Sequence, residues 1–325
     1  TEKSFVNAIV GLMATGGSSN HTIHLIAMAR AAGIILVWDD FDAISKVVPL
    51  LCKMYPNGSA DVNHFRDAGG MGVVIAQLLQ AGLVHNDVNT VVGFGLENYA
   101  VQPILEDQTV KFEKSSLDSN DSNIISTIQN PFNSEGGIKV LKGNLGESIV
   151  KTSALKPNQL CITAPAVVFE SQEQLQQAFK NKELEKDFIA VVRYQGPKAN
   201  GMPELHGLLP ALGVLQDKGY KVALITDGRM SGASGKVPSA IHLTPEAMGG
   251  GLIAKINTGD IINIDIPNGL LELKVSSTVL KNRIVKKTNT IKYGCGTELF
   301  SPIRSLVNQA NEGATIFELP GRELA

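Results

Sequence analysis

The chain has 325 residues, of which 43% are apolar, 18% charged and 5% aromatic, and its formal net charge is −2. This length predicts roughly two domains with a sizeable core, and the apolar content excludes a mostly disordered chain. The small net charge argues against a nucleic-acid-binding protein, and no apolar run is long enough to span a membrane. The 3 cysteines are widely spaced, which disfavours a secreted disulfide framework and favours a reducing cytoplasm.

Residues 1–100 are predicted to be mainly helical. The chain starts at Thr1 directly with an apolar pattern, so we expect it to be a segment of a longer protein. Gly, Pro and Asp residues divide the apolar periodicity into separate helices. In chain order we expect a turn at Gly16-Gly17, a helix ending at Gly33, a short strand at Ile34–Val37, a helix from Asp39 or Asp40 that stops near Pro56-Asn57-Gly58, and a further helix after Gly69-Gly70.

Residues 105–123 change in character, because they are rich in Asp, Ser, Asn and Lys. This composition predicts a linker or a long exposed loop, and a polar loop inside one domain is the alternative. From about residue 125 the β content rises, with helices between the earlier strands, which predicts an α/β sheet followed by a β-rich ending. The expected strands are Ile138–Leu141, Ile189–Val192, Val222–Ile225, Ile261–Ile266 and Leu270–Val275, and the expected helices are about 171–180 and 207–218.

The first motif that could carry chemistry is the Gly- and Ser-rich run from Ala14 to His21. Two glycines followed by hydroxyl residues at the start of a helix can leave N–H groups and the positive end of the helix dipole facing an anion. An ordinary glycine turn with a serine cap is equally compatible with the spacing. His21 and His24 are three residues apart, which permits metal binding, although capping or packing histidines are commoner. The chain has no Walker A loop and no dinucleotide fingerprint, so no nucleotide cofactor is expected.

The second motif runs from Arg193 to Glu204, where a strand is followed by a Gly/Pro loop and then by a helix expected near Pro203. Glu204 would then lie at the carboxyl end of a strand, where a carboxylate can bind a hard cation. The alternative is that Glu204 only caps the helix.

The third motif is the most specific. The buried strand that ends at Ile225 leads into Thr226–Lys236, and open α/β sheets bind ligands at such strand ends. The glycines of this loop would let a ligand approach the backbone closely. They would also expose hydroxyl groups beside cationic side chains, where a hydroxyl could act as a base or bind an anion. The side chains concerned are Ser231, Ser234, Arg229 and Lys236.

The cysteines have no C-x-x-C spacing. Cys52 lies in a helical pattern, Cys161 near a strand and Cys295 between two glycines. We favour a structural role for all three.

Together these stretches resemble the dihydroxy-acid dehydratase / 6-phosphogluconate dehydratase family. The resemblance spans nearly the whole chain, and the segments HTIHLIAMARAAG and SGKVPSAIHLTPEA resemble its 6-phosphogluconate branch. The other matching stretches are GLMATGGSSN, GGIKVLKGNLG, VVRYQGPKANGMPELHGLLPALG, ALITDGRMSGA and GTELFSPIR.

The resemblance implies an α/β fold: residues 1–118 would end an α/β cluster-binding catalytic domain, and residues 119–325 would form a β-rich swivelling β/β/α barrel-like domain. It implies a hydro-lyase, a cytoplasmic homodimer of the Entner-Doudoroff pathway, that dehydrates 6-phospho-D-gluconate to 2-dehydro-3-deoxy-6-phospho-D-gluconate. An iron–sulfur cluster, 4Fe-4S in type, would act as Lewis acid. The family's cluster cysteines precede the ATGGS motif, so none of the three cysteines here is expected to ligate it.

Matched residue by residue, the resemblance makes Ser231 the proposed base and Glu204 a ligand of a divalent metal such as Mg²⁺. It places Gly16, Gly17, Ser18, Ser19 and Asn20 against substrate, with Arg229 and Ser234 beside them. From their charge and position, Lys236 and Ser239 are candidates for the 6-phosphate. We expect this chain alone to be an inactive fragment. The alternatives are a dehydratase for another sugar acid or dihydroxy acid, and a non-catalytic sugar-phosphate-binding or assembly module.

Overall fold

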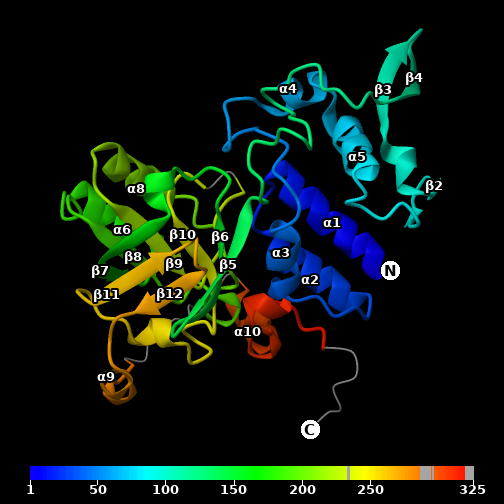
Figure 1. Ribbon diagram of the computed structural model, residues 1–325. Helices are drawn as coiled ribbons and strands as arrows, with labels where there is room; N and C mark the ends of the chain where they lie inside the picture. Colours follow the sequence, from blue (N-terminus) through cyan, green and yellow to red (C-terminus); the bar gives the residue numbers. More distant parts are fainter. Residues whose placement is uncertain (233–234, 286–293, 295, 319–325) are drawn as a thin grey trace. The chain divides into compact units, whose positions relative to one another are not determined.

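The computed structural model describes residues 1–232, 235–285, 294 and 296–318 (Figure 1). Their contacts divide the chain into two compact units. The first unit comprises Thr1–Ser18 and Asp39–Ile138, and the second comprises Ser19–Trp38 and Lys139–Ala325. None of the described helices is long and apolar enough to cross a membrane.

The first unit is built on the buried helix α1, whose Ile9, Val10 and Met13 are almost inaccessible to solvent. A capping box at Asp61 starts α4, because the Asp61 carboxylate accepts hydrogen bonds from two backbone N–H groups at 2.8 and 3.0 Å. The elements are α1 (Glu2–Thr15), α3 (Trp38–Ser45), α4 (Val62–Asp67), α5 (Gly70–Gln80), η1 (Leu96–Tyr99), and the strand pairs β1 (Asn89–Thr90) with β2 (Gly93–Phe94) and β3 (Val101–Glu106) with β4 (Thr109–Lys114).

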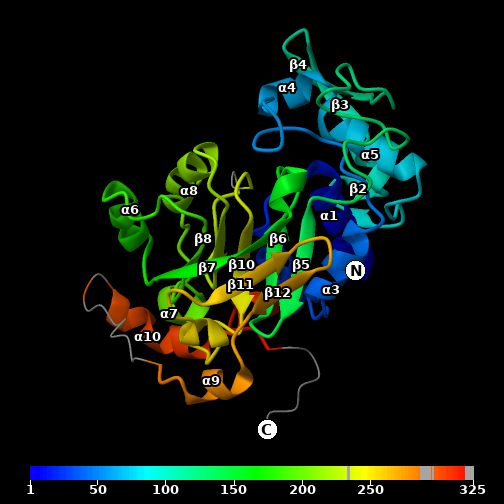
Figure 2. The ribbon, with the colours of Figure 1, turned by 60° about the vertical axis from the view of Figure 1, so that its left-hand side comes forward.

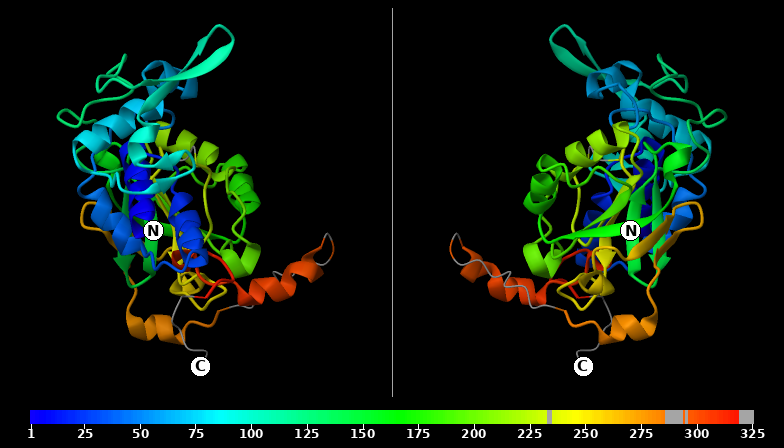
Figure 3. Two further views of the ribbon diagram at one scale, coloured as in Figure 1. Left: turned by 90° about the vertical axis from the view of Figure 1, so that its right-hand side faces the viewer. Right: turned by 90° about the vertical axis from the view of Figure 1, so that its left-hand side faces the viewer.

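The helix predicted after Gly69-Gly70 is confirmed as α5. The polar stretch 105–123 is not a linker throughout, because its first part belongs to the β3–β4 hairpin, which projects from the rest of this unit in Figure 3. The helix predicted to run on toward Pro56 is too long: α3 ends at Ser45, and Cys52 is extended and bridged to Ile125.

The second unit is a closed barrel of eight strands in the order β10-β6-β5-β12-β11-β7-β8-β9 (Figure 1). The neighbours β7, β8, β9 and β10 run parallel, whereas β6, β11 and β12 make antiparallel pairs. The strands are β5 (Ile138–Gly143), β6 (Gly146–Lys151), β7 (Cys161–Phe169), β8 (Phe188–Val192), β9 (Val222–Thr226), β10 (Ser239–Thr244), β11 (Ile261–Asp265) and β12 (Leu270–Leu273).

Helices α6 and α8 lie beside one another on the outside of the parallel strands (Figures 2 and 3). The strands β8 and β9 are buried at every position, as expected for parallel strands covered on both faces. The remaining elements are α2 (His21–Ala31), η2 (Pro157–Gln159), α6 (Gln172–Lys180), α7 (Pro197–Asn200), α8 (Leu208–Asp217), η3 (Leu252–Lys255), α9 (Ser277–Asn282), α10 (Thr297–Leu306) and η4 (Ala310–Glu312).

The five strands predicted after residue 125 and the two helices between them are confirmed within two residues at each end. The predicted α/β class is confirmed as a mixed α/β chain with a closed barrel. Two further local predictions are wrong. Residues 34–37 have no regular structure, so no strand follows Gly33, and no helix begins near Pro203, since α8 starts at Leu208.

Candidate active site

A buried carboxylate, Asp227, holds together the loops at the carboxyl ends of three parallel strands. Asp227 follows β9, and its oxygens accept hydrogen bonds from the N–H of Tyr194 at 3.1 Å, Gln195 at 2.9 Å and Ala247 at 2.9 Å. The donors follow β8 and β10, so three separate loops share one anchor. Burial raises the pKa of Asp227, and the N–H donors act against that rise.

A second buried carboxylate, Glu246, positions the loop that begins α7. Its two oxygens accept the N–H groups of Lys198 at 2.9 Å and Ala199 at 3.2 Å. A Cβ at Gly196 would lie 2.3 Å from a Glu246 oxygen, so this approach requires glycine. Burial raises the pKa of Glu246. Asp227 and Glu246 therefore fix the backbone on which the second and third motifs are carried.

The structure pairs Glu204 with Arg229. The Arg229 Nη1 group donates to Glu204 Oε1 at 2.9 Å, and its Nε group donates to the Met202 carbonyl at 2.7 Å. The backbones also meet, because the Leu205 N–H donates to the Arg229 carbonyl at 3.1 Å. The Glu204 side chain is 44% exposed. The predicted metal ligand and a predicted substrate-binding cation thus lie together and form an ion pair at the solvent boundary.

The other predicted residues of the third motif and of the start of β10 differ in exposure and in their hydrogen-bond partners. Ser231 is half-buried and Lys236 is exposed. The Lys236 carbonyl accepts the side-chain amides of Gln159 at 3.0 Å and Gln216 at 3.1 Å. Ser239 begins β10 and donates to the Val237 carbonyl at 2.9 Å. The predicted substrate residue Ser234 lies outside the described residues.

The glycines of the first motif end one helix rather than open the next. Gly16 has a φ of +59° and caps α1, with its N–H directed at the Met13 carbonyl. The Gly17 N–H bonds the Leu12 carbonyl at 3.0 Å. These two N–H groups are therefore engaged within the first unit, which removes the simplest form of the predicted anion site. Gly16, Gly17 and Ser18 belong to the first unit, whereas Ser19 and Asn20 belong to the second and are buried there.

A small cavity of about 10 Å³ in the second unit joins the first motif to the third. Its walls come from the start of α2, the end of β6, the Thr226–Lys236 motif and β10. The lining residues are Ser19, Lys151, Met230, Gly235, Val237, Ser239 and Ile241. Sequence reasoning did not single out Lys151, whose only sequence cue is a lysine ending the apolar stretch Ile149-Val150.

His242 is a second functional candidate that sequence reasoning missed. It is completely buried in β10 and has a φ of +59°, which is strained for a residue other than glycine. The backbone N–H of His242 donates to the Gly228 carbonyl at 3.0 Å, and the Nδ1 atom of its ring lies 3.4 Å from Thr22 Oγ1. Burial lowers the pKa of His242 to about 3, with smaller contributions from Arg229 and His24. A neutral His242 thus connects α2 with the third motif.

The His242 ring also has an unsatisfied atom. The Thr22 hydroxyl donates to the Ser19 carbonyl at 2.8 Å, so its oxygen is left to accept a hydrogen bond from the Nδ1–H group of His242. The Nε2 atom of His242 is then a buried acceptor, and no described residue donates to it.

The described residues do not fit an iron–sulfur cluster. Cys52 is buried in the first unit, where burial raises the pKa of its thiol to about 12, so the thiol stays protonated. Cys161 is exposed in the second unit, 3.7 Å from an Asp265 oxygen, and the pKa of its thiol is also raised. Cys295 lies outside the described part of the chain. Within that part, no three His, Cys, Asp or Glu side chains are placed to hold a metal ion.

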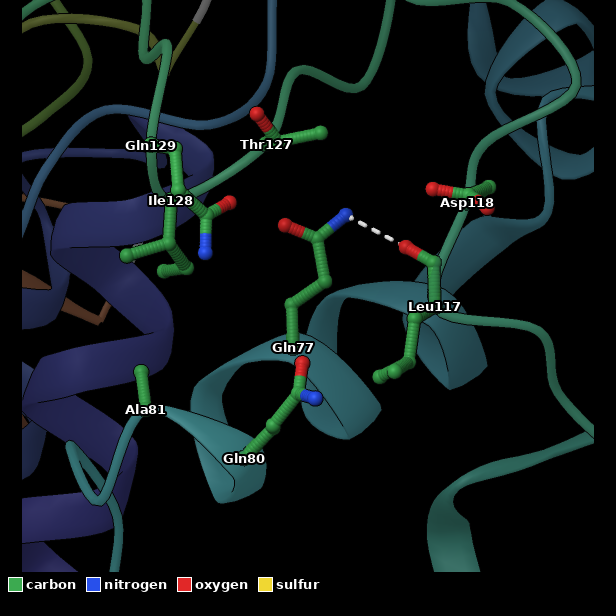
Figure 4. Close-up of a pocket in the computed structure, with 8 residues that line it drawn as sticks. All are labelled: Gln77, Gln80, Ala81, Leu117, Asp118, Thr127, Ile128 and Gln129. Carbon is green, nitrogen blue, oxygen red and sulfur yellow. Dashed lines mark hydrogen bonds between the residues drawn. The ribbon is translucent and has the colours of Figure 1, made fainter.

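Two larger cavities are lined by few of the candidate catalytic or substrate-binding residues. One of about 270 Å³ in the first unit is lined mainly by amides and apolar groups, and Figure 4 shows Gln77 donating across it to the Leu117 carbonyl. The other, of about 490 Å³, lies between α7 and α10 in the second unit. Its wall includes Met202, whose carbonyl holds Arg229, and Arg304.

Comparisons with known proteins agree on one family. The model for the dihydroxy-acid/6-phosphogluconate dehydratase C-terminal domain matches residues 123–314, and the N-terminal model matches residues 1–99. The chain is 54% identical over 318 residues to the phosphogluconate dehydratase of Rhizobium meliloti and 54% identical over 316 residues to that of Escherichia coli K12. It is 38% identical over 324 residues to the dihydroxy-acid dehydratase of Clostridium novyi.

These alignments cover 97% of this chain but 52%, 52% and 55% of the three relatives. The chain therefore spans about half the length of the curated relatives it matches.

Proposed function

The chain belongs to the dihydroxy-acid/6-phosphogluconate dehydratase family, and on that premise we propose that it is part of a phosphogluconate dehydratase. The whole enzyme would be a hydro-lyase that converts 6-phospho-D-gluconate to 2-dehydro-3-deoxy-6-phospho-D-gluconate and water. The observation that best supports a share of the site in this chain is the cavity at which Ser19 of the first motif meets Met230 and Gly235 of the third. The Ser19 end of the first motif and the third motif therefore lie together in the second unit.

In the proposed reaction, Ser231 removes the proton from C2 and the hydroxyl at C3 leaves. A serine hydroxyl is a weak base, so it needs a neighbour that takes its own proton. Arg229 would attract the anionic substrate, while its ion pair with Glu204 fixes the guanidinium in one orientation. Asp227 and Glu246 would hold the loops rigid without touching the substrate.

We propose that the iron–sulfur cluster implied by the family is held by cysteines outside this chain, in the half of the relatives that it does not cover. When bound, such a cluster would assist departure of the hydroxyl as a Lewis acid. Glu204 remains our proposed ligand of a divalent metal such as Mg²⁺. Because Arg229 bonds the Oε1 atom of Glu204, such a metal would share or compete for this carboxylate with the guanidinium.

Further proposals concern the architecture. We propose that residues 119–325 form a swivelling domain and residues 1–118 the end of the cluster-binding domain. We also propose that the protein is cytoplasmic and forms a homodimer. The free thiols of Cys52 and Cys161 support the cytoplasmic location. The exposed apolar side chains of α10, among them Leu299 and Leu306, support the dimer.

The test compares two proteins, both reconstituted with iron and sulfide without oxygen. One is this chain alone. The other, called here the joined protein, adds the half of the Rhizobium meliloti relative that this chain does not cover. We expect the joined protein to dehydrate 6-phosphogluconate and the chain alone to be inactive. Turnover of unphosphorylated gluconate or of a branched dihydroxy acid at a higher kcat/KM would instead favour the other dehydratases of the family. Binding of 6-phosphogluconate without any turnover would favour a binding module.

A further inference from the structure

Lys151 is a buried lysine with no acidic partner among the described residues. It ends β6 and is 7% exposed. Burial lowers the pKa of Lys151 to about 8, and no carboxylate or hydrogen bond among the described residues contributes to that shift. A buried ammonium without a partner is unfavourable, so the amine gives up its proton at a lower pH than an exposed lysine does.

The fold places Lys151 beside the loop that carries the proposed base. Strand β6 pairs with β10 through Ile149 and Ile241, and continuing this antiparallel register by two residues brings Lys151 opposite Ser239. A Cβ built at Gly235 would lie 3.4 Å from Lys151 Cδ, so the lysine stem packs against that glycine. Met230, the residue before Ser231, lines the same cavity.

The other titratable groups of neighbouring elements do not line the cavity that contains Lys151. Glu147 lies at the other end of β6, and on β10 His242 alternates with the cavity-lining Ser239 and Ile241. Arg229 is directed at Glu204, and Lys236 is exposed. No ionisable side chain other than Lys151 lines the cavity within the described part of the chain.

The cavity volume decides between two roles for this amine. A volume of about 10 Å³ matches a single water molecule and is too small for a phosphate or carboxylate group. Lys151 is therefore suited to exchange a proton with a hydroxyl or a water, and unsuited to bind the anionic end of a substrate.

We propose that Lys151 is the proton acceptor for Ser231, directly or through one water, an inference that rests on the proposed function. The neutral Lys151 amine takes the Ser231 hydroxyl proton while the Ser231 oxygen takes the proton from substrate C2. The electron pair of the broken C2–H bond forms the C2–C3 double bond as the C3–O bond breaks. The departing hydroxide receives the proton held by the Lys151 ammonium and leaves as water, which restores the neutral amine and the serine hydroxyl.

The first test uses the chain itself and needs no activity. Lysine side chains are labelled with ¹⁵N at Nζ, and the Lys151 resonance is assigned from Lys151→Met and followed by NMR as a function of pH. We expect Lys151 to titrate near pH 8 and its midpoint to move in Ser231→Ala. The matched control is Lys221→Met, which removes an exposed lysine and should leave the Lys151 midpoint in place. The proposal is overturned if the Lys151 titration midpoint is that of an exposed lysine, or if Ser231→Ala leaves this midpoint unchanged.

The second test uses the joined protein. We expect kcat/KM for 6-phosphogluconate to rise with pH through about 8 and kcat to fall on the order of 10²- to 10⁴-fold in Lys151→Met. Lys151→Arg should not restore activity, because arginine stays protonated. Methylamine should restore part of the rate to Lys151→Ala. Full activity in Lys151→Met overturns the proposal and leaves the function standing. Coupled titration of Lys151 and Ser231 without turnover of any sugar acid supports the pair and refutes the proposed substrate.

Discussion

Replacing His242 by Asn should remove a pH dependence from the stability of the second unit. His242 is fully buried, and its pKa is lowered to about 3 in the folded protein, whereas an unfolded histidine titrates near pH 6.5. As the pH falls below about 6.5, the His242 imidazole therefore binds a proton in the unfolded chain but stays neutral in the folded chain. The folded state loses about 2 kcal/mol between pH 7 and pH 5, at about 1.4 kcal/mol for each full pH unit.

The assay is urea unfolding followed by circular dichroism at several pH values between about 5 and 7. Asn suits the test because it tolerates the positive φ of this position and can donate to Thr22 in place of Nδ1. The His242→Asn variant should show a smaller pH slope than the parent, and the exposed-site control His85→Asn should retain the parent slope. If the two variants keep the same slope, His242 is not held neutral and the tautomer inferred for its ring is wrong.

Two further predictions concern the loops around the candidate site and use the same unfolding assay. Asp227→Ala leaves three buried N–H groups without an acceptor and should lower the free energy of unfolding by about 3–6 kcal/mol. The control Asp217→Ala, at an exposed position, should change it little. Equal effects would mean that Asp227 does not anchor the loops. Gly251→Ala places a Cβ 1.8 Å from the Pro245 carbonyl oxygen and should destabilise the chain, whereas Gly213→Ala in α8, where a Cβ meets nothing within 4 Å, should stabilise it by roughly 0.5–1 kcal/mol. The reverse order of stabilities would contradict both assignments.

Two of the strands that sequence reasoning predicted, β8 and β9, are buried on both faces. Residues 188–192 and 222–226 are continuous apolar runs, and tertiary structure merely confirms that local preference. The missed strands carry residues that argue against a strand when read locally. The β7 strand contains Pro165, and β10 contains the buried His242. Their pairing across the barrel outweighs these local preferences.

Long-range contacts also explain the wrong predictions in the first unit. Leu51 and Cys52 fit a helical pattern, but both N–H groups bond to the Ala14 carbonyl, so the segment is extended. The β3–β4 hairpin turns at Asp107 and Gln108, both with positive φ and neither a glycine. A polar composition with no Asn-Gly or Asp-Gly pair gave no indication of that turn.

Sequence motifs pointed to Ser231 and Glu204 as candidates, because glycine-rich loops after buried strands can be recognised locally, and their roles stay predictions. Lys151 and His242 are single residues in apolar strands, and only the closed barrel brings them against those loops. Such isolated polar residues within buried strands are the one sequence feature that could have indicated them.

The central claim is that this chain supplies the base of a sugar-acid dehydratase, and Ser231→Ala in the joined protein tests it most directly. The measurement is the dehydration rate with 6-phospho-D-gluconate that carries deuterium at C2. The account predicts a parent rate that is slowed by the isotope and a Ser231→Ala rate lower on the order of 10²-fold or more, with KM little changed. A Ser231→Ala protein that dehydrates the substrate at the parent rate would contradict the account.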